Sequence, residues 1–127
     1  MNEEAKKALA ELNDIADSAA TGKMKLYKSF MSDDREITEL EFDFRALTGF
    51  EFIRAMDSDT DGKANSFRMT DKQAMTLFCA AASKKSGVDQ ADIENGLCIE
   101  DAIKAVQLAT VFFSASSRAG NVRITKG

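Results

Sequence analysis

Apolar and polar residues alternate strictly from Ile37 to Phe44 and then take a helical spacing up to Met56. One side of the alternating stretch holds Thr38, Leu40, Phe42 and Phe44, and the other holds Glu39, Glu41 and Asp43. A period of two predicts a half-buried strand. Thr48 and Glu51 form a capping box, which opens an amphipathic helix. We therefore expect a strand that leads sharply into a helix, with an apolar side that the rest of the chain must cover.

A second strand is predicted at 23–30, where apolar residues again alternate with polar ones. The polar run 32–35 then makes a turn, so the two strands form a hairpin. An isolated hairpin is marginally stable in water, so helices must pack on it. Ahead of it, residues 2–20 carry a narrow, alanine-rich apolar stripe that predicts a weakly docked helix ending at Gly22.

Three further helices are predicted in the second half of the chain. Thr70 and Gln73 form another capping box, which opens a helix over 71–86 with Gly87 placed to end it. A short acidic helix at 89–95 follows, and the last helix runs over 99–116.

The predicted fold class is therefore α+β and mostly helical, with a β-hairpin packed against about four or five helices. The organisation we expect is an N-terminal amphipathic helix at 1–22, a single compact domain at 23–117 and a flexible tail at 118–127.

The last helix has apolar residues on two sides. The first face consists of Ile99, Ala102, Ile103, Val106, Ala109 and Phe113, and the second of Leu108, Val111, Phe112 and Ala115. Either the helix is buried on all sides, or one face awaits a partner. Because the first face runs the full length of the helix, we expect it to pack on the strand–helix unit. Leu108, Val111 and Phe112 are then predicted to contribute to self-association or partner binding.

The amino-acid composition excludes several classes of function. The chain has 127 residues, a net charge of −4 and no histidine. An acidic chain is a poor nucleic-acid ligand, and the missing histidine removes the commonest general base and metal ligand. Cys79 and Cys98 are interpreted as inert, reduced packing residues. With neither a signal peptide nor a membrane-length apolar run, we expect a cytoplasmic, non-catalytic protein without cofactors, nucleic-acid partners or membrane partners.

The strongest local motif is an aspartate-rich loop with the spacing of an EF-hand. Asp57, Asp59 and Asp61 occupy its first ligand positions, and Gly62 takes the sharp turn. Its twelfth position, where a glutamate should close the calcium shell, is Arg68. A solvated loop with Asx turns is therefore the favoured interpretation, and a calcium-binding module centred on Asp57–Arg68 is the alternative.

The order of the elements resembles that of a known family. An acidic alternating strand leads into Leu-Thr-Gly at 47–49 and a short helix. An alanine-rich helix ending in LFCAAASKKSG (77–87) follows. A short acidic helix then precedes a helix that starts with IEDAI (99–103) and carries Phe-Phe at 112–113. This pattern, over about 36–116, resembles the small tail assembly chaperones of long-tailed bacteriophages and prophages.

The resemblance implies a non-catalytic protein of the bacterial host cytoplasm that acts during virion morphogenesis. Such chaperones bind the long, aggregation-prone tape-measure protein, keep it soluble and help to recruit tail tube protein. The implied partners are therefore the tape-measure protein, the tail tube protein and, in a homo-oligomer, further copies of the chain. Neither the aspartate-rich loop nor the long N-terminal helix belongs to the pattern of the family.

Overall fold

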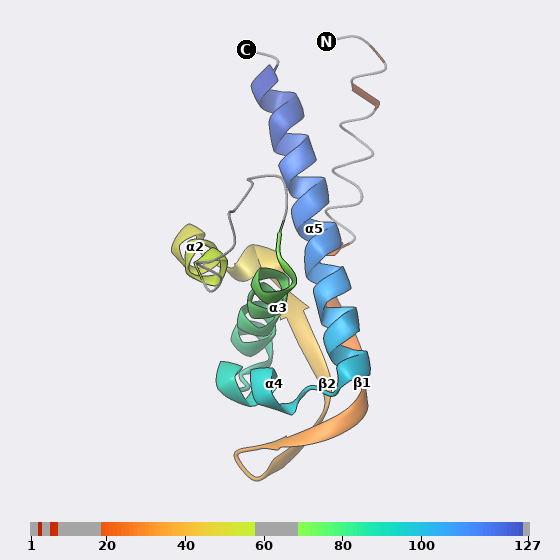
Figure 1. The fold of residues 1–127 in the computed structure, drawn as a ribbon, viewed down its shortest axis with the longest axis vertical. Coiled ribbons are helices and arrows are strands. Elements are labelled where there is room, and N and C mark those ends of the chain that lie inside the picture. Colours follow the sequence, from red (N-terminus) through yellow and green to blue (C-terminus); the bar gives the residue numbers. More distant parts are fainter. Residues whose placement is uncertain (1–2, 4–5, 8–18, 58–68, 126–127) are drawn as a thin grey trace.

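The computed structural model describes residues 3, 6, 7, 19–57 and 69–125, with side chains to Ser116. Their fold is α+β and mostly helical, as predicted. In chain order the elements are β1 (Thr21–Ser32), β2 (Arg35–Asp43), a 3-10 turn (Phe44–Ala46), α2 (Gly49–Met56), α3 (Asp71–Ser86), α4 (Gln90–Gly96) and α5 (Ile99–Thr125). Figure 1 shows α3 and α5 side by side against the hairpin, with α2 to one side.

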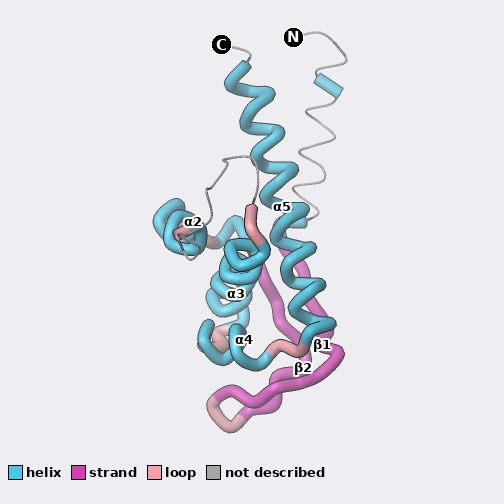
Figure 2. Tube along the Cα trace, in the orientation of Figure 1, coloured by secondary structure: helices cyan, strands magenta, loops and turns pink. Residues whose placement is uncertain are grey.

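The two strands pair as an antiparallel hairpin, drawn in magenta in Figure 2. Asp33 and Asp34 make the turn with positive φ angles of 49° and 63°, a conformation that short polar residues tolerate and that two-residue hairpins use. Leu40, Phe42 and Phe44 are buried as expected. The expected inward position of Thr38 is wrong, because Thr38 is exposed and Ile37 is buried in its place.

A bulge in β1 explains this change of phase. Lys25 pairs with Glu39, and the next pair joins Phe30 to Ile37. Residues 26–29 of β1 therefore lie opposite the single residue Thr38 of β2. Extra residues in one strand shift which side chains face the core and leave backbone groups outside the strand ladder.

The helix ends follow the predicted caps. Thr48 and Glu51 make a reciprocal capping box at α2, and Thr70 and Gln73 make another at α3. Gly87 ends α3 with a φ of 72°, in the left-handed region that glycine adopts without strain. These local signals are sufficient to fix where α2 begins and where α3 begins and ends.

Three phenylalanines form the centre of the core between the hairpin and α3. The Phe42 ring centroid lies 5.3 Å from that of Phe44 and 5.2 Å from that of Phe78. Around this cluster α3 contributes Ala74, Leu77, Cys79, Ala81 and Ala82, and α5 contributes Ala105 and Ala109. The small alanine side chains allow both helices to approach the sheet closely.

Buried polar side chains join the elements at two further points. Gln73 Nε2 donates to the Met56 carbonyl at 2.8 Å, which ties the end of α2 to the start of α3. The Ser32 hydroxyl donates to an Asp92 carboxylate oxygen at 2.6 Å, which ties α4 to the end of β1. The elements are thus held together by hydrogen bonds as well as by apolar packing.

The predicted organisation of the two ends of the chain can be compared with the described residues. Most of the expected N-terminal helix lies outside the described residues, and the described ones, Glu3, Lys6, Lys7, Ala19 and Ala20, are helical. At the other end α5 continues to Thr125, where a flexible tail was expected from residue 118. A formed helix propagates readily, and this segment has no proline to stop it.

Candidate interaction surface

Asp101 in the first turn of α5 fills the gap that the β1 bulge leaves in the hairpin. Its carboxylate accepts hydrogen bonds from the backbone N–H of Tyr27, at 2.9 and 3.0 Å from the two oxygens, and of Lys28 at 3.2 Å. The Cys98 thiol donates to the same carboxylate at 3.2 Å. The Asp101 side chain is fully buried, so it takes the place of a strand partner for two backbone donors.

The surroundings of Asp101 keep it ionised. Burial alone would raise the pKa of this carboxyl group. The hydrogen bonds from Tyr27, Cys98 and Lys28, together with the positive charge of Lys104, outweigh burial, and the pKa lies below its ordinary value. A buried carboxylate with this many donors is a strong constraint on how α5 can rotate about its axis.

That rotation corrects the predicted packing face of α5 at its two isoleucines. Residues two positions apart on a helix lie about 200° apart around its axis. With Asp101 facing the hairpin, Ile99 and Ile103 therefore face away from it, and their side chains are 75% and 54% exposed. The inner face holds Asp101, Ala105 and Phe112, whose ring stacks on Phe44 with centroids 5.0 Å apart, together with Ala109 of the expected face. Two more residues of the expected face also pack: Val106 contacts the core, and the Phe113 ring stacks on that of Phe52 with centroids 6.0 Å apart.

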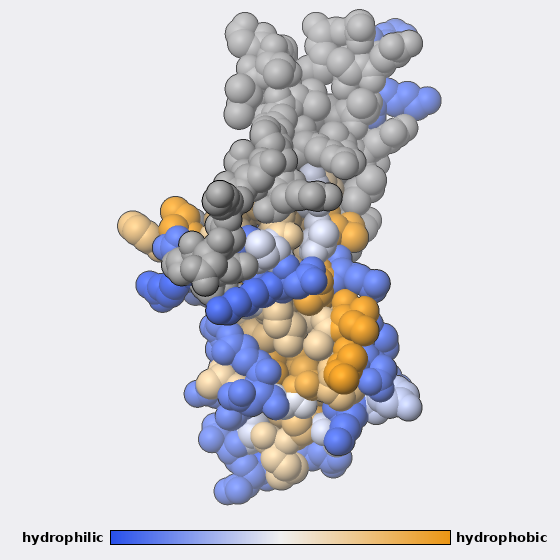
Figure 3. Space-filling view, in the orientation of Figure 1, coloured by the Kyte–Doolittle hydropathy of each residue, from blue (hydrophilic) through white to orange (hydrophobic). Residues whose placement is uncertain are grey.

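The outward isoleucines line an open groove of about 500 Å³ between α3 and α5. Its floor and walls are apolar side chains, namely Met75, Ile99, Ala102, Ile103 and Val106, and its polar edge is Asp71, Lys72 and Gln107. Figure 3 shows hydrophobic residues gathered on this face over α5, bordered by hydrophilic ones. An apolar surface rimmed by polar residues is typical of a protein–protein contact site.

The residues predicted from the sequence to bind a partner lie elsewhere on α5. Leu108 and Phe112 are half-buried and pack against the core, whereas Val111 is 48% exposed. Leu108 and Val111 line a second, mainly apolar hollow of about 400 Å³ beside Gly22 and Met24. The structure therefore brings Leu108 and Val111 together and places Phe112 on Phe44, and their role in self-association or partner binding stays a prediction.

Sequence reasoning named the groove residues but assigned them to the core. The periodicity of α5 shows two apolar faces. It does not indicate which of the two packs against the core. The deciding residue, Asp101, has the position of an ordinary acidic residue in a first helical turn. Only the distant bulge of β1 reveals that it is buried.

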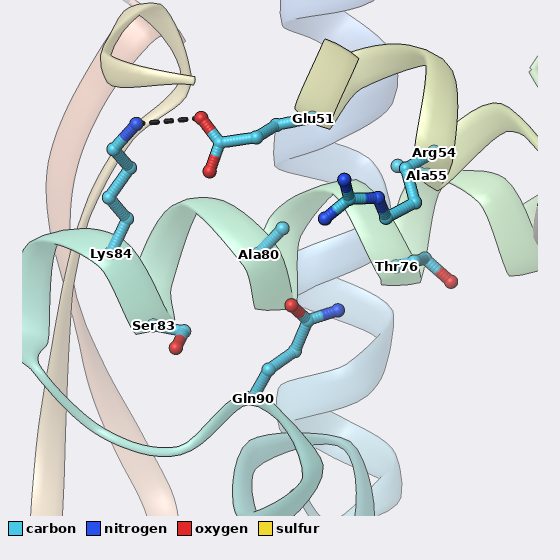
Figure 4. A pocket seen from close by; sticks show the side chains of 8 residues that line it. All are labelled: Glu51, Arg54, Ala55, Thr76, Ala80, Ser83, Lys84 and Gln90. Carbon is cyan, nitrogen blue, oxygen red and sulfur yellow. Dashed lines mark hydrogen bonds and ion pairs between the residues drawn. The ribbon is translucent and has the colours of Figure 1, made fainter. Parts of the chain in front are cut away.

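A polar pocket of about 280 Å³ lies between α2, α3 and the start of α4 (Figure 4). Lys84 Nζ and Glu51 Oε1 form an ion pair at 2.6 Å at one end of it, and the side chains of Arg54 and Gln90 extend toward one another. The hydrogen bond from Lys84 and the backbone N–H of Thr48 lower the Glu51 pKa to about 2. A carboxylate this acidic is a weak proton acceptor at neutral pH, so the pocket is better explained as a helix-to-helix contact.

The two cysteines also have structural surroundings. Cys79 is buried in α3, and burial, followed by the negative charge of Glu94, raises its thiol pKa to about 12. Cys98 is half-buried and donates to Asp101. A thiol held protonated is a poor nucleophile, which agrees with the interpretation of Cys79 as packing.

The aspartate-rich loop cannot be assessed in the same way. Of its ligand positions only Asp57 is described, as the exposed C-cap of α2, and the remainder lies outside the described residues. Calcium binding by this loop therefore stays a prediction. In the part of the chain that is described, no three acidic or cysteine side chains gather closely enough to hold a metal ion.

Comparison with known proteins adds no relative. No family model, curated protein or solved structure matches the chain. None of the helices in the described ranges combines the length and apolar character needed to cross a lipid bilayer.

Proposed function

We propose that this protein is a tail assembly chaperone of a long-tailed bacteriophage or prophage. In this role it acts without catalysis in the host cytoplasm, binds the tape-measure protein and assists assembly of the tail tube. The observation that carries the proposal is the groove between α3 and α5, where Ile99 and Ile103 stand exposed on a well-packed domain. What supports a binding role is that these two side chains are contiguous with Met75 and Val106 in one apolar surface with a polar border.

Two further features support a binding role. The order of acidic strand, short helix, alanine-rich helix and Phe-Phe helix is the one that resembles these chaperones. The buried carboxylate at Asp101 is used to hold two structural elements together. The polar pocket beside Glu51 contains an ion pair between α2 and α3. The shifted pKa values of Glu51 and Asp101 come with structural hydrogen bonds, and that of Cys79 comes mainly from burial.

Co-expression with a client tests the proposal. The client is the product of the long, helix-rich reading frame that we expect downstream of this gene in a phage tail cluster. We expect the chaperone to move that product from the pellet to the soluble fraction and to co-purify with it. The control is an equally long coiled-coil protein of unrelated origin, which should stay in the pellet. If the tape-measure product stays insoluble and does not co-purify, the proposal is wrong.

A further inference from the structure

We infer that the groove between α3 and α5 binds a single amphipathic α-helix of the client, with Ile99 and Ile103 as the main anchors. This inference rests on the proposed chaperone function for the identity of the client. The groove itself is defined by α3 on one side and α5 on the other. A third helix laid between them would contact both, as in helix-in-groove recognition.

The spacing of the groove residues suits a helical ligand. Ile99, Ile103 and Val106 follow one another at i, i+4 and i+7 along α5, which spans about 10 Å, or two helical turns. Met75 faces them from α3 and, being unbranched, adapts to ligands of varied shape. A client helix with apolar residues at the same intervals would place two or three side chains between these four.

The size of the groove favours one helix over a second copy of this chain. A stable dimer interface uses about 20–30 residues on each side. The groove is lined by eight residues, and only Ile99 and Ile103 among them are large, apolar and mostly exposed. A surface of this size fits one face of a single helix.

The charges at the edge of the groove define the chemistry of the ligand further. Its polar lining is one acid, Asp71, one base, Lys72, and the neutral Gln107. These charges cancel, so the groove selects for an apolar stripe and shows no preference for the sign of the flanking residues. Binding should therefore change little with salt concentration, because screening acts only on net electrostatic attraction.

A peptide titration tests the groove directly. The probe is a fluorescent synthetic peptide of about 18 residues with leucine repeated at i, i+4, i+7 and i+11 among alanine, glutamate and lysine. A second peptide has the same composition in a scrambled order without an apolar stripe. We expect the striped peptide to bind, the scrambled one not to bind, and Ile103→Glu to weaken binding by about tenfold or more, as loss of a central anchor does.

The matched control is Ile53→Glu on α2. Ile53 and Ile103 are both isoleucines, each 54% exposed on a helix, so the two substitutions change charge and exposure equally. Ile53→Glu should leave peptide affinity unchanged. Equal effects of the two variants, no binding of the striped peptide, or a loss caused by Val111→Glu but not by Ile103→Glu would overturn the inference. So would self-association that Ile103→Glu abolishes in sedimentation, because a second copy would then occupy the groove.

The same variants distinguish failure of this inference from failure of the proposed function. If wild-type protein and Ile103→Glu keep the tape-measure product equally soluble, the chaperone function stands and the groove is not its site. If the striped peptide binds through Ile103 but the tape-measure product stays insoluble, the groove is a helix site and the proposed client is wrong.

Discussion

The two faces of the first turns of α5 reverse the usual distribution of polar and apolar residues. On the inner face the charged Asp101 is fully buried beside Ala105, whereas on the outer face Ile99 and Ile103 are largely exposed. Burying two isoleucines would contribute about 3–6 kcal/mol, and two hydrogen bonds to a charged acceptor are worth about 3–6 kcal/mol. These two contributions are similar in size, and the inner face carries the small, fully buried side chains Ala105 and Ala109.

The difference teaches that the orientation of α5 follows the hydrogen bonds between Asp101 and the hairpin, and not the positions of the largest apolar residues of the helix. The bulge in β1 presents two N–H groups, and α5 brings the acceptor. The isoleucines are left exposed on the outer face.

The largest effect is expected in the core that the inner face of α5 covers, at Phe42 of β2. Its ring packs between Phe44 and Phe78, so Phe42→Ala should lower the free energy of unfolding by about 3–5 kcal/mol in urea denaturation. The matched control is Phe50→Ala, because the Phe50 side chain is 80% exposed and should change stability by less than about 0.5 kcal/mol. Similar losses for the two variants would mean that Phe42 is not a core residue.

Asp101→Ala is expected to cost somewhat less, about 2–4 kcal/mol. The substitution leaves the backbone N–H groups of Tyr27 and Lys28 without the charged acceptor of their partly buried hydrogen bonds. The neighbouring Glu100 is exposed and acidic in the same helical turn, so Glu100→Ala controls for helix propensity and charge. Thermal and urea unfolding of both variants provide the comparison, and equal stability would show that the bulge does not depend on Asp101.

Acidification should remove the stabilisation by the Asp101 carboxylate without any substitution. Because the folded-state pKa of Asp101 lies below the ordinary 3.8, the unfolded chain binds the proton first as pH falls. The contribution is complete above about pH 4 and is lost as pH falls through the folded-state pKa. The stability difference between wild type and Asp101→Asn should therefore be constant from pH 7 to about 4 and shrink below it.

Glu51 titrates in an overlapping range and needs its own control. Its pKa falls from 4.5 to about 2, so its contribution also disappears as pH decreases between those values. Recording the acid curves in a Glu51→Gln background isolates the Asp101 effect. A difference curve that stays flat below pH 4 would contradict the role assigned to Asp101.

The smallest expected effect belongs to the outer face. Ile103→Ser should change the free energy of unfolding by less than about 0.5 kcal/mol, because most of the side chain is already in water. The same urea titration measures it. A loss above about 1.5 kcal/mol would show that Ile103 is held by intramolecular packing, and the groove would then not be an open surface.

Local signals predicted most of the fold. Both capping boxes, the glycine at the end of α3 and the polar hairpin turn depend on neighbours within a few residues, and each is found where the sequence placed it. The phase of β2 before Leu40 was not predictable, because it depends on a bulge in the other strand.

The candidate site was predictable only in its residue types. The sequence shows that α5 has two apolar faces, but the choice between them is made by Asp101 and by residues 27 and 28, which lie more than 70 positions away in the chain. Periodicity within one helix cannot carry that information. The continuation of α5 to Thr125 was missed for a related reason, since weak helix formers continue a helix that the body of the protein has already started.

The hydrogen bonds at the outer edges of the hairpin have a consequence for assembly. The Ser86 hydroxyl accepts from the Glu41 N–H at 2.9 Å and donates to the Glu41 carbonyl at 2.7 Å, while Asp101 occupies the bulge of β1. At these points an incoming strand would have to displace a helix side chain before it could pair. Both strands of a two-stranded sheet are edge strands, with which a further strand could pair. Here Ser86 blocks part of the β2 edge and Asp101 blocks part of the β1 edge. These side chains therefore protect the hairpin from being extended strand by strand through its edges.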